Sequence, residues 1–143
     1  MYMEPKIIEG ATFSDHRGTL SFVNDFNFPD IQRFYIISNS EGHPLRAWQG
    51  HKLDNKYFYC IQGTFRISYV RIDNWQLPSK DLEVKSTILK ATESNILYVP
   101  NGYANAIEAL EKDSRLISFA TLPLNRVHED DVRFDSNTWK IND

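Results

Sequence analysis

Hydrophobic and polar residues alternate along much of this chain, most regularly in residues 64–73, where Phe65, Ile67 and Tyr69 share a face opposite Arg66, Ser68 and Val70. A period of two predicts a β-strand with one face turned toward a core. The same kind of short extended segment, bounded by turn signals, is predicted at residues 6–9, 20–24, 32–38, 45–52, 57–62, 84–90, 95–99, 103–110, 114–121 and 131–134.

Turn residues separate these segments, for example around Gly18 and in the sequence Pro100-Asn101-Gly102. Helical periodicity is nearly absent, and residues 106–112 would give at most one or two helical turns. Many short strands with few helices predict an all-β sandwich or barrel. At 143 residues we expect a single domain covering residues 1–143.

Composition narrows the function classes. The chain is 41% hydrophobic and 24% charged, which is ordinary for a globular protein, and its 13% aromatic content suits a sheet and a cavity lined by rings. The net charge is −3, and there is no basic tract, so we expect no nucleic-acid partner.

The single cysteine, Cys60, excludes an intrachain disulfide and fits a reducing compartment; we expect it to be a small core residue. The first ten residues lack an apolar signal core, and no run approaches the length of a membrane span. These features predict a cytoplasmic protein with no membrane partner.

Residues 45–63 concentrate the candidate chemistry, with one histidine among aromatic and cationic residues. Read as two strands joined by a polar turn at residues 53–56, this stretch places Gln49 and His51 on one face, because alternate residues of a strand share a face. A strand with glutamine and histidine on one face is typical of the wall of a polar cavity.

Two segments resemble the halves of the cupin double-stranded β-helix, a small jelly-roll barrel. They are Gln49-x-His51, with Gly63 twelve residues after His51, and residues 98–105 around the Pro-x-Gly turn. Metal-binding cupins carry His-x-His and a carboxylate in the first half and a histidine in the second. Here Gln49, Lys56 and Asn105 stand at or near three of those positions. The resemblance therefore predicts a cupin with no metal and no cofactor.

Four segments also resemble the dTDP-4-dehydrorhamnose 3,5-epimerases and the related dTDP-sugar 3,4-ketoisomerases. Residues 13–20 (FSDHRGTL) are similar to an F-x-D-x-RG-x-(F/L) entry, and residues 46–52 (RAWQGHK) to the RG-x-H-A-H-K stretch of the ketoisomerases. Residues 89–110 are similar to the segment around the Pro-x-Gly turn, and residues 131–135 to a closing I-x-W-x-D segment. The resemblance covers nearly the whole chain.

This resemblance implies cofactor-free chemistry on a nucleotide-linked, dTDP-type 4-keto-6-deoxyhexose, in deoxysugar or cell-surface polysaccharide biosynthesis. A ketone acidifies the hydrogen on the adjacent carbon, a histidine removes it, and a tyrosine reprotonates the enolate. Histidine suits the first step because its ordinary pKa lies close to working pH. The family also implies a homodimer.

Carried over by position, the epimerase histidine falls at Gln49, so His51 is the predicted base. The epimerase acid tyrosine falls near Ser118, so Tyr35, which resembles a ketoisomerase tyrosine, is the predicted acid. Tyr59 and Tyr103 are the alternative acids.

The remaining candidates would bind substrate. Arg17 and Arg46 are expected to hold the diphosphate, although strict alternation aims Arg46 away from His51 unless a bulge or an oligomer contact intervenes. Asn105 would hold a sugar hydroxyl, and Gln49, Tyr59 and Tyr103 complete the predicted binding set. Lys52 and Lys56 are expected to be solvated cations at the strand edges, and His16, His43 and His128 to have no role.

The residues leave three interpretations open. The first is an epimerase or a keto-isomerase, which differ in where the proton returns. The second is a non-catalytic nucleotide-sugar or carbohydrate-binding cupin that has lost the catalytic pair, as the replacements at Gln49 and Ser118 would allow. The third is a metal-dependent cupin, which would contain bound iron, nickel or zinc.

Overall fold

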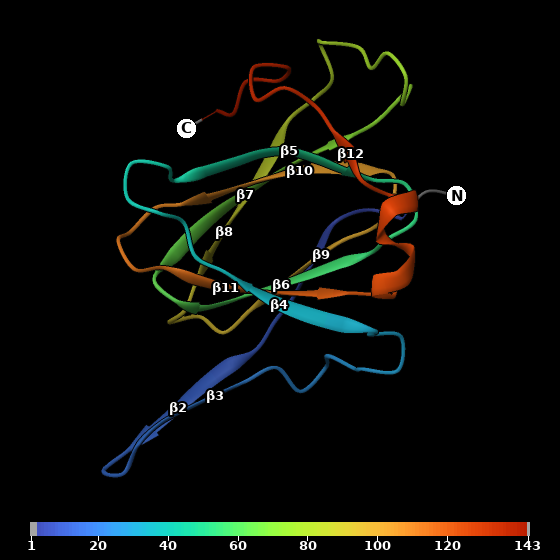
Figure 1. Cartoon of the computed structure of the whole chain (residues 1–143). Helices are drawn as coiled ribbons and strands as arrows, with labels where there is room; N and C mark the ends of the chain where they lie inside the picture. The colour runs from blue at the N-terminus through green and yellow to red at the C-terminus, as the bar shows by residue number, and fades with distance from the viewer. Residues whose placement is uncertain (1–2, 143) are drawn as a thin grey trace.

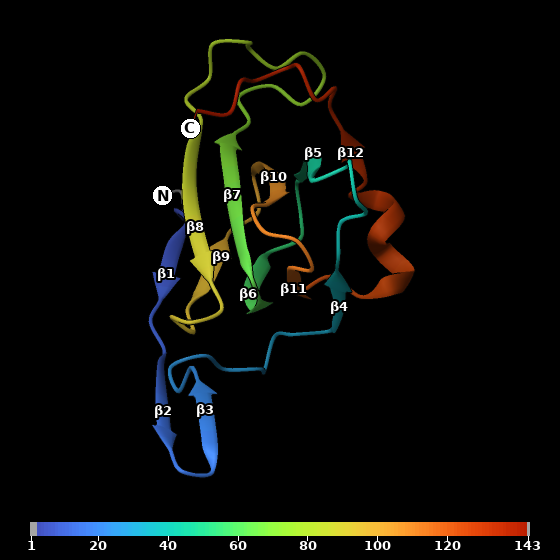
Figure 2. The same ribbon diagram turned by 90° about the vertical axis from the view of Figure 1, so that its left-hand side faces the viewer.

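Two five-stranded antiparallel sheets face each other and form a double-stranded β-helix, the jelly-roll barrel of the cupins (Figures 1 and 2). The structure, a computed structural model, describes residues 3–142. The first sheet has the order β1 (Lys6–Ile8), β9 (Ile96–Val99), β6 (Lys56–Gln62), β11 (Arg115–Ala120) and β4 (Arg33–Ile37). The second has the order β12 (Val132–Arg133), β5 (Leu45–His51), β10 (Tyr103–Ala109), β7 (Thr64–Arg71) and β8 (Lys85–Lys90).

Alternation along the strands decides which side chains enter the barrel. In β6, Phe58 and Cys60 are buried, whereas Tyr57 and Tyr59 on the other face are only half-buried. This alternation is that of the strand predicted at residues 57–62. Residues 106–109, considered for a helical turn, belong to β10.

The sequence analysis did not predict two of the secondary-structure elements. The strand β2 (Ala11–Asp15) pairs with β3 (Gly18–Phe22) in a hairpin that projects from the barrel (Figure 1). All ten of its residues except Phe22 are exposed, so burial leaves no pattern in the sequence. The second is η1 (Leu124–Glu129), a 3₁₀ helix after β11. No helix in residues 3–142 is long and apolar enough to cross a membrane.

The core between the sheets is built from inward-facing residues of both, among them Phe58, Phe65, Leu97 and Leu116. Cys60 lies in this core, as expected, with 2% of its surface exposed. Burial raises the pKa of the Cys60 thiol to about 11, so the group is neutral near pH 7 and behaves as a small apolar residue.

A second apolar cluster covers the outer face of β5. Trp48 packs edge-on against Trp139, with ring centroids 5.4 Å apart. A Cβ atom at Gly50 would lie 2.6 Å from a ring atom of Trp75 and 3.0 Å from one of Phe134, so glycine lets both rings lie close to the strand. The segment after β12 therefore clamps β5 from outside and fixes its inward-facing side chains.

Candidate active site

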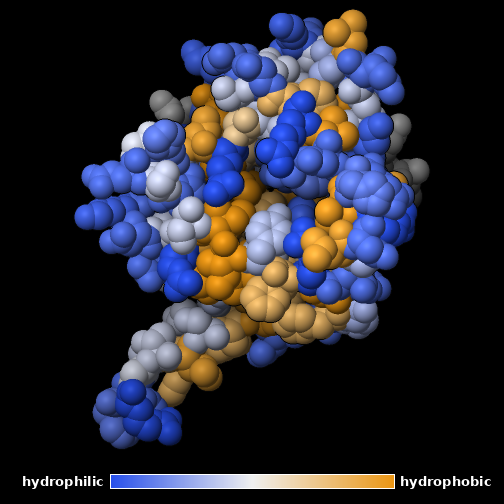
Figure 3. Space-filling view, viewed as in Figure 1, coloured by the Kyte–Doolittle hydropathy of each residue, from blue (hydrophilic) through white to orange (hydrophobic). Residues whose placement is uncertain are grey.

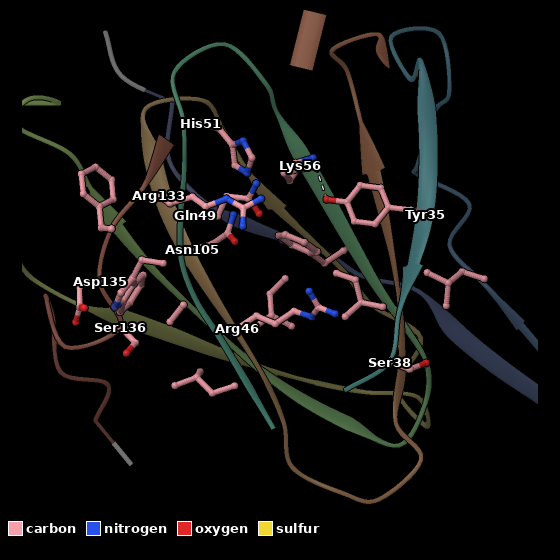
Figure 4. A pocket seen from close by; sticks show the side chains of 18 residues that line it. Tyr35, Ser38, Arg46, Gln49, His51, Lys56, Asn105, Arg133, Asp135 and Ser136 are labelled. Atoms are coloured by element: carbon pink, nitrogen blue, oxygen red, sulfur yellow. Dashed lines mark hydrogen bonds between the residues drawn. The ribbon is translucent and has the colours of Figure 1, made fainter. Parts of the chain in front are cut away.

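A cavity of about 620 Å³ lies inside the barrel, between the two sheets, and a second of about 320 Å³ adjoins it. Five residues line both, which makes the two cavities one continuous site: Tyr35, Gln49, His51, Lys56 and Arg133. Figure 4 shows these side chains converging from β4, β5, β6 and β12. Figure 3 shows the hollow on the surface, with both hydrophobic and hydrophilic residues around it.

Three polar side chains form a row across the second sheet. Gln49 is the register partner of Asn105 on β10 and of Arg133 on β12. All three line the larger cavity, because register partners in adjacent antiparallel strands share a face. The amide nitrogen of Asn105 is buried and has no hydrogen-bond partner. An unpaired buried donor is costly, so this nitrogen is a ready hydrogen-bond donor to a ligand.

His51 is paired with a carboxylate. Its Nδ1 lies 3.5 Å from Oδ2 of Asp130, and both side chains are buried. When Nδ1–H points to the carboxylate, Nε2 of the neutral ring remains the acceptor available to the cavity. This is the arrangement a general base requires.

Backbone amides hold Asp130 in place. Its oxygens accept the N–H groups of Lys52, Leu53 and Asp54 at 2.6, 2.9 and 3.0 Å. Burial by itself raises the pKa of Asp130, but the hydrogen bonds from His51 and these amides outweigh it and leave the pKa below its ordinary value. The carboxylate therefore stays ionised at neutral pH beside the imidazole.

Tyr35 meets a buried cation. The ammonium of Lys56 donates to the Tyr35 hydroxyl oxygen at 3.1 Å and lies 3.0 Å from Oδ2 of Asp54. The Lys56 side chain is only 4% exposed, so the prediction of a solvated edge cation was wrong. Its position was misjudged because Lys56 lies on the inward face of β6, in line with Phe58 and Cys60.

Ser118 explains how Tyr35 reaches the cavity. Ser118 on β11 is fully buried and is the register partner of both Tyr35 on β4 and Phe58 on β6. The epimerase acid tyrosine falls near Ser118, which is a small residue here. The adjacent strand β4 supplies Tyr35 on the same face instead.

Arg46 lines the larger cavity in spite of the alternation argument. The register between β5 and β10 shifts between Asn105 and Ile107, so that Gln49 pairs with Asn105 but Arg46 pairs with Ile107. Three residues on β5 span two on β10, and this bulge brings Arg46 to the inward face. The sequence analysis required a bulge or an oligomer contact for Arg46 to face the site, and the structure contains the bulge.

Three predicted site residues do not line either cavity within this chain. Arg17 lies in the turn of the β2–β3 hairpin, exposed and paired with Asp15. The Tyr59 hydroxyl bonds to Ser94 on the outer side of β6, and Tyr103 packs in the core against Tyr69. Tyr59 faces outward from the barrel. Tyr103 is the register partner of His51, but it is packed into the core.

A metal could be sought at the cluster of His51, Asp54 and Asp130, whose ligand atoms lie within 4.8 Å of one another. The donor set does not fit. Asp130 already accepts three backbone N–H groups, and the Asp54 oxygens accept two backbone N–H groups and pair with the Lys56 ammonium. A metal ion would need free carboxylate oxygens in this cluster, but the Lys56 ammonium already pairs with Oδ2 of Asp54.

Sequence reasoning missed four site residues: Asp54, Lys56, Asp130 and Arg133. Asp54 and Asp130 looked like ordinary loop carboxylates because the backbone N–H groups that fix them lie more than 60 residues away. Lys56 carried a usable signal, since its phase places it with the buried residues of β6. Arg133 lay in the segment predicted as extended at residues 131–134 but was not singled out.

Comparisons with known proteins identify a family and a shared fold. A family model described as FdtA: WxcM-like, C-terminal, matches residues 3–137. No curated protein sequence matches the chain.

Solved structures share the fold at low identity. A histidine mutant of the 3,4-ketoisomerase QdtA from Thermoanaerobacterium thermosaccharolyticum, in complex with TDP-4-keto-6-deoxyglucose, has a TM-score of 0.65 and 20% identity, over 85% of this chain and 83% of that one. The rmlC epimerase of Mycobacterium tuberculosis has a TM-score of 0.69 and 20% identity, over 86% and 66%. The dTDP-4-dehydrorhamnose 3,5-epimerase of Bacillus anthracis, with TDP and PPi bound, has a TM-score of 0.67 and 18% identity, over 82% and 71%. These likenesses establish the fold.

Proposed function

The chain belongs to the family described as FdtA: WxcM-like, C-terminal, and from this premise we propose that it isomerises a nucleotide-linked keto sugar. The substrate class is a dTDP-type 4-keto-6-deoxyhexose, and the reaction is an epimerisation or a 3,4-keto-isomerisation without a cofactor. The setting would be cytoplasmic deoxysugar or cell-surface polysaccharide biosynthesis. Related folds that bind TDP or TDP-4-keto-6-deoxyglucose support the nucleotide-sugar ligand.

One observation carries the proposal: a carboxylate-backed histidine and a lysine-bound tyrosine line the same cavity from opposite sheets. His51 comes from β5 of the second sheet and Tyr35 from β4 of the first. In Figure 4 the Tyr35 hydroxyl points toward Lys56, near the side of the cavity that His51 occupies. A sugar ring bound in this cavity would lie between a candidate base and a candidate acid.

The chemistry follows from these positions. Nε2 of His51 takes the proton from the carbon beside the ketone, and the C–H electron pair moves into an enolate. The Lys56 ammonium offsets the developing negative charge in the buried site. Tyr35 then gives its hydroxyl proton to the receiving carbon, and its phenolate remains beside Lys56 until it is reprotonated. His51 then releases its proton to solvent, and solvent reprotonates Tyr35. In a 3,4-keto-isomerisation a proton also moves from the C3 hydroxyl to the C4 oxygen, so the sugar neither gains nor loses atoms overall.

The nucleotide diphosphate would bind at the cationic rim. Arg46 and Arg133 both line the larger cavity and have exposed guanidinium groups. Guanidinium forks form paired, charge-assisted hydrogen bonds to phosphate oxygens. Asn105, with its unpaired amide nitrogen, would hold a sugar hydroxyl or the ketone oxygen farther inside.

The proposal is tested by following solvent hydrogen. We expect the protein in D₂O to incorporate deuterium at a carbon beside the ketone of dTDP-4-keto-6-deoxyglucose, detected by proton NMR. The same spectra identify the product and so separate epimerase from keto-isomerase. In Tyr35→Phe, exchange at the first carbon is expected to persist while product formation falls by about 10²-fold or more, because His51 can return its own deuteron. Binding without any deuterium uptake would instead establish a carbohydrate-binding protein.

We also propose that the chain forms a homodimer through its β2–β3 hairpin. Phe13 and Leu20 are register partners on one face of the hairpin and are 57% and 63% exposed. A two-stranded ribbon standing away from a core is marginally stable in water. Packing against a second copy would cover this face, and it would carry Arg17 away from its own barrel toward the diphosphate of the other copy.

Introducing a charge on the hairpin tests the dimer. We expect Phe13→Asp to shift the protein from dimer to monomer in size-exclusion chromatography with light scattering, because an aspartate cannot be buried there unpaired. Leu77→Asp is the matched control, since Leu77 is 80% exposed on the loop between β7 and β8, at the opposite end of the molecule (Figure 1). A wild-type protein that runs as a monomer at all concentrations contradicts the dimer.

A further inference from the structure

The buried ion pair of Lys56 contains a carboxylate to which the proposed reaction gives no role. Lys56 and Asp54 are 4% and 3% exposed, and their charged atoms lie 3.0 Å apart. An isolated ammonium at such a site would be strongly unfavourable, because burial removes its hydration. The placement of the Lys56 ammonium beside Tyr35 therefore depends on Asp54.

The two oxygens of Asp54 have different partners. Oδ1 accepts the backbone N–H groups of Thr121 and Leu122 at 2.9 and 3.0 Å, and the Thr121 hydroxyl at 3.2 Å. Oδ2 faces Lys56. The first oxygen ties the carboxylate to the end of β11, and the second presents its charge to the ammonium. Asp54 is thus fixed by groups that take no part in the chemistry.

We propose that Asp54 is a positioning residue that acts through Lys56, holding its ammonium against the Tyr35 hydroxyl so that Tyr35 can serve as the acid. The Asp54–Lys56–Tyr35 chain is the counterpart, on the acid side, of Asp130 and His51 on the base side. In each case a buried carboxylate is fixed by backbone N–H groups and aligns one side chain of the cavity.

This proposal rests on the proposed isomerase function. When Tyr35 protonates the enolate, its O–H bond breaks, a C–H bond forms, and a phenolate remains 3.1 Å from the ammonium. The charge on Lys56 stabilises that phenolate. Without Asp54 the ammonium has no counter-ion in its buried position, and the stabilisation of the phenolate weakens.

A double-mutant cycle tests the assignment. We expect Asp54→Asn to lower kcat by about 10²-fold with little change in KM, because the substituted atom lies on the acid side and not at the diphosphate rim. Lys56→Gln is expected to cause at least the same loss. The variant carrying both substitutions should be no slower than Lys56→Gln alone, since Asp54 acts only through Lys56. Lys56→Arg, which keeps the charge, should recover part of the rate.

Asp73→Asn is the matched control. Asp73 also accepts backbone N–H groups, from Asn74 and Ser79, but lies on an exposed loop outside the cavity. Its replacement should leave kcat unchanged. Losses at Asp54 and Lys56 that multiply in the double variant would overturn the proposal and assign Asp54 to the structure of the turn alone. An Asp54→Asn rate within threefold of wild type would also overturn it.

Thermal unfolding without substrate gives a second readout. Asp54→Asn and Lys56→Gln should each lower Tm, and the double variant should lose less than the sum, because each single change leaves a buried partner uncompensated. Additive losses in Tm overturn the pairing whatever the activity. A wild-type protein without deuterium uptake refutes the isomerase, and the unfolding cycle then still decides whether Asp54 positions Lys56.

Discussion

Replacing His51 by asparagine is expected to lower deuterium incorporation into dTDP-4-keto-6-deoxyglucose by about 10²–10⁴-fold, the usual contribution of a general base. Asparagine fills a similar volume but cannot accept and return a proton at neutral pH. The diphosphate contacts proposed for Arg46 and Arg133 are unchanged, so the affinity for dTDP should stay close to that of wild type. Proton NMR in D₂O measures the exchange, and isothermal calorimetry measures the affinity.

The control for this variant is His43→Asn. His43 lies on the exposed loop before β5, and its ring contacts the carbonyl of Glu41. Its replacement should leave both exchange and binding unchanged. If His51→Asn kept wild-type exchange, the base would have to be another group, and the proposed mechanism would fail.

The second large effect is expected for Asp130→Asn. An asparagine can still accept some of the three backbone N–H groups, but it no longer offers a carboxylate to Nδ1 of His51. We expect kcat to fall by about 10²-fold or more, because the ring loses its preferred tautomer and the charge that stabilises the protonated state. The free energy of unfolding should fall by about 1–3 kcal/mol, since a buried donor loses its partner. Steady-state kinetics and urea unfolding measure the two effects.

The pH dependence of stability gives an independent check on Asp130. Its pKa is lowered in the folded protein, so the stabilisation is complete above the ordinary aspartate pKa and is lost as the pH falls through the folded value. The difference in unfolding free energy between wild type and Asp130→Asn should therefore shrink as the pH falls below about pH 4. A difference that stayed constant at lower pH would show that the carboxylate charge is not involved.

The fold could be read from the sequence because most strands bury one face. Residues 57–62 illustrate this, since Phe58 and Cys60 enter the barrel as their period requires. The hairpin strand β2 was not predicted, because it buries neither face and its sequence therefore shows no alternation. His51, Gln49 and Asn105 were found because local motifs place them on inward faces.

The parts of the site that were missed depend on distant segments. Asp130 meets the amides of residues 52–54 only because η1 returns the chain to the end of β5. Asp54 meets Thr121 because β11 runs antiparallel beside β6, with Ala120 opposite Lys56. Neither contact follows from local propensity, because a loop aspartate has the same sequence signature whether it is solvated or buried. Lys56 was misjudged because a cation was assumed to seek water, although its strand phase placed it inside.

The segment that clamps β5 has a consequence for the order in which the protein becomes competent during synthesis. Asp130, Arg133 and Trp139 all follow the last long barrel strand, β11, in the chain. Strands β1 to β11 of a nascent chain can pair before the ribosome has released Asp130, which pairs with His51, or Arg133. The proposed isomerisation therefore cannot start on a partly made barrel, and we expect activity to appear only in a chain whose closing segment has docked.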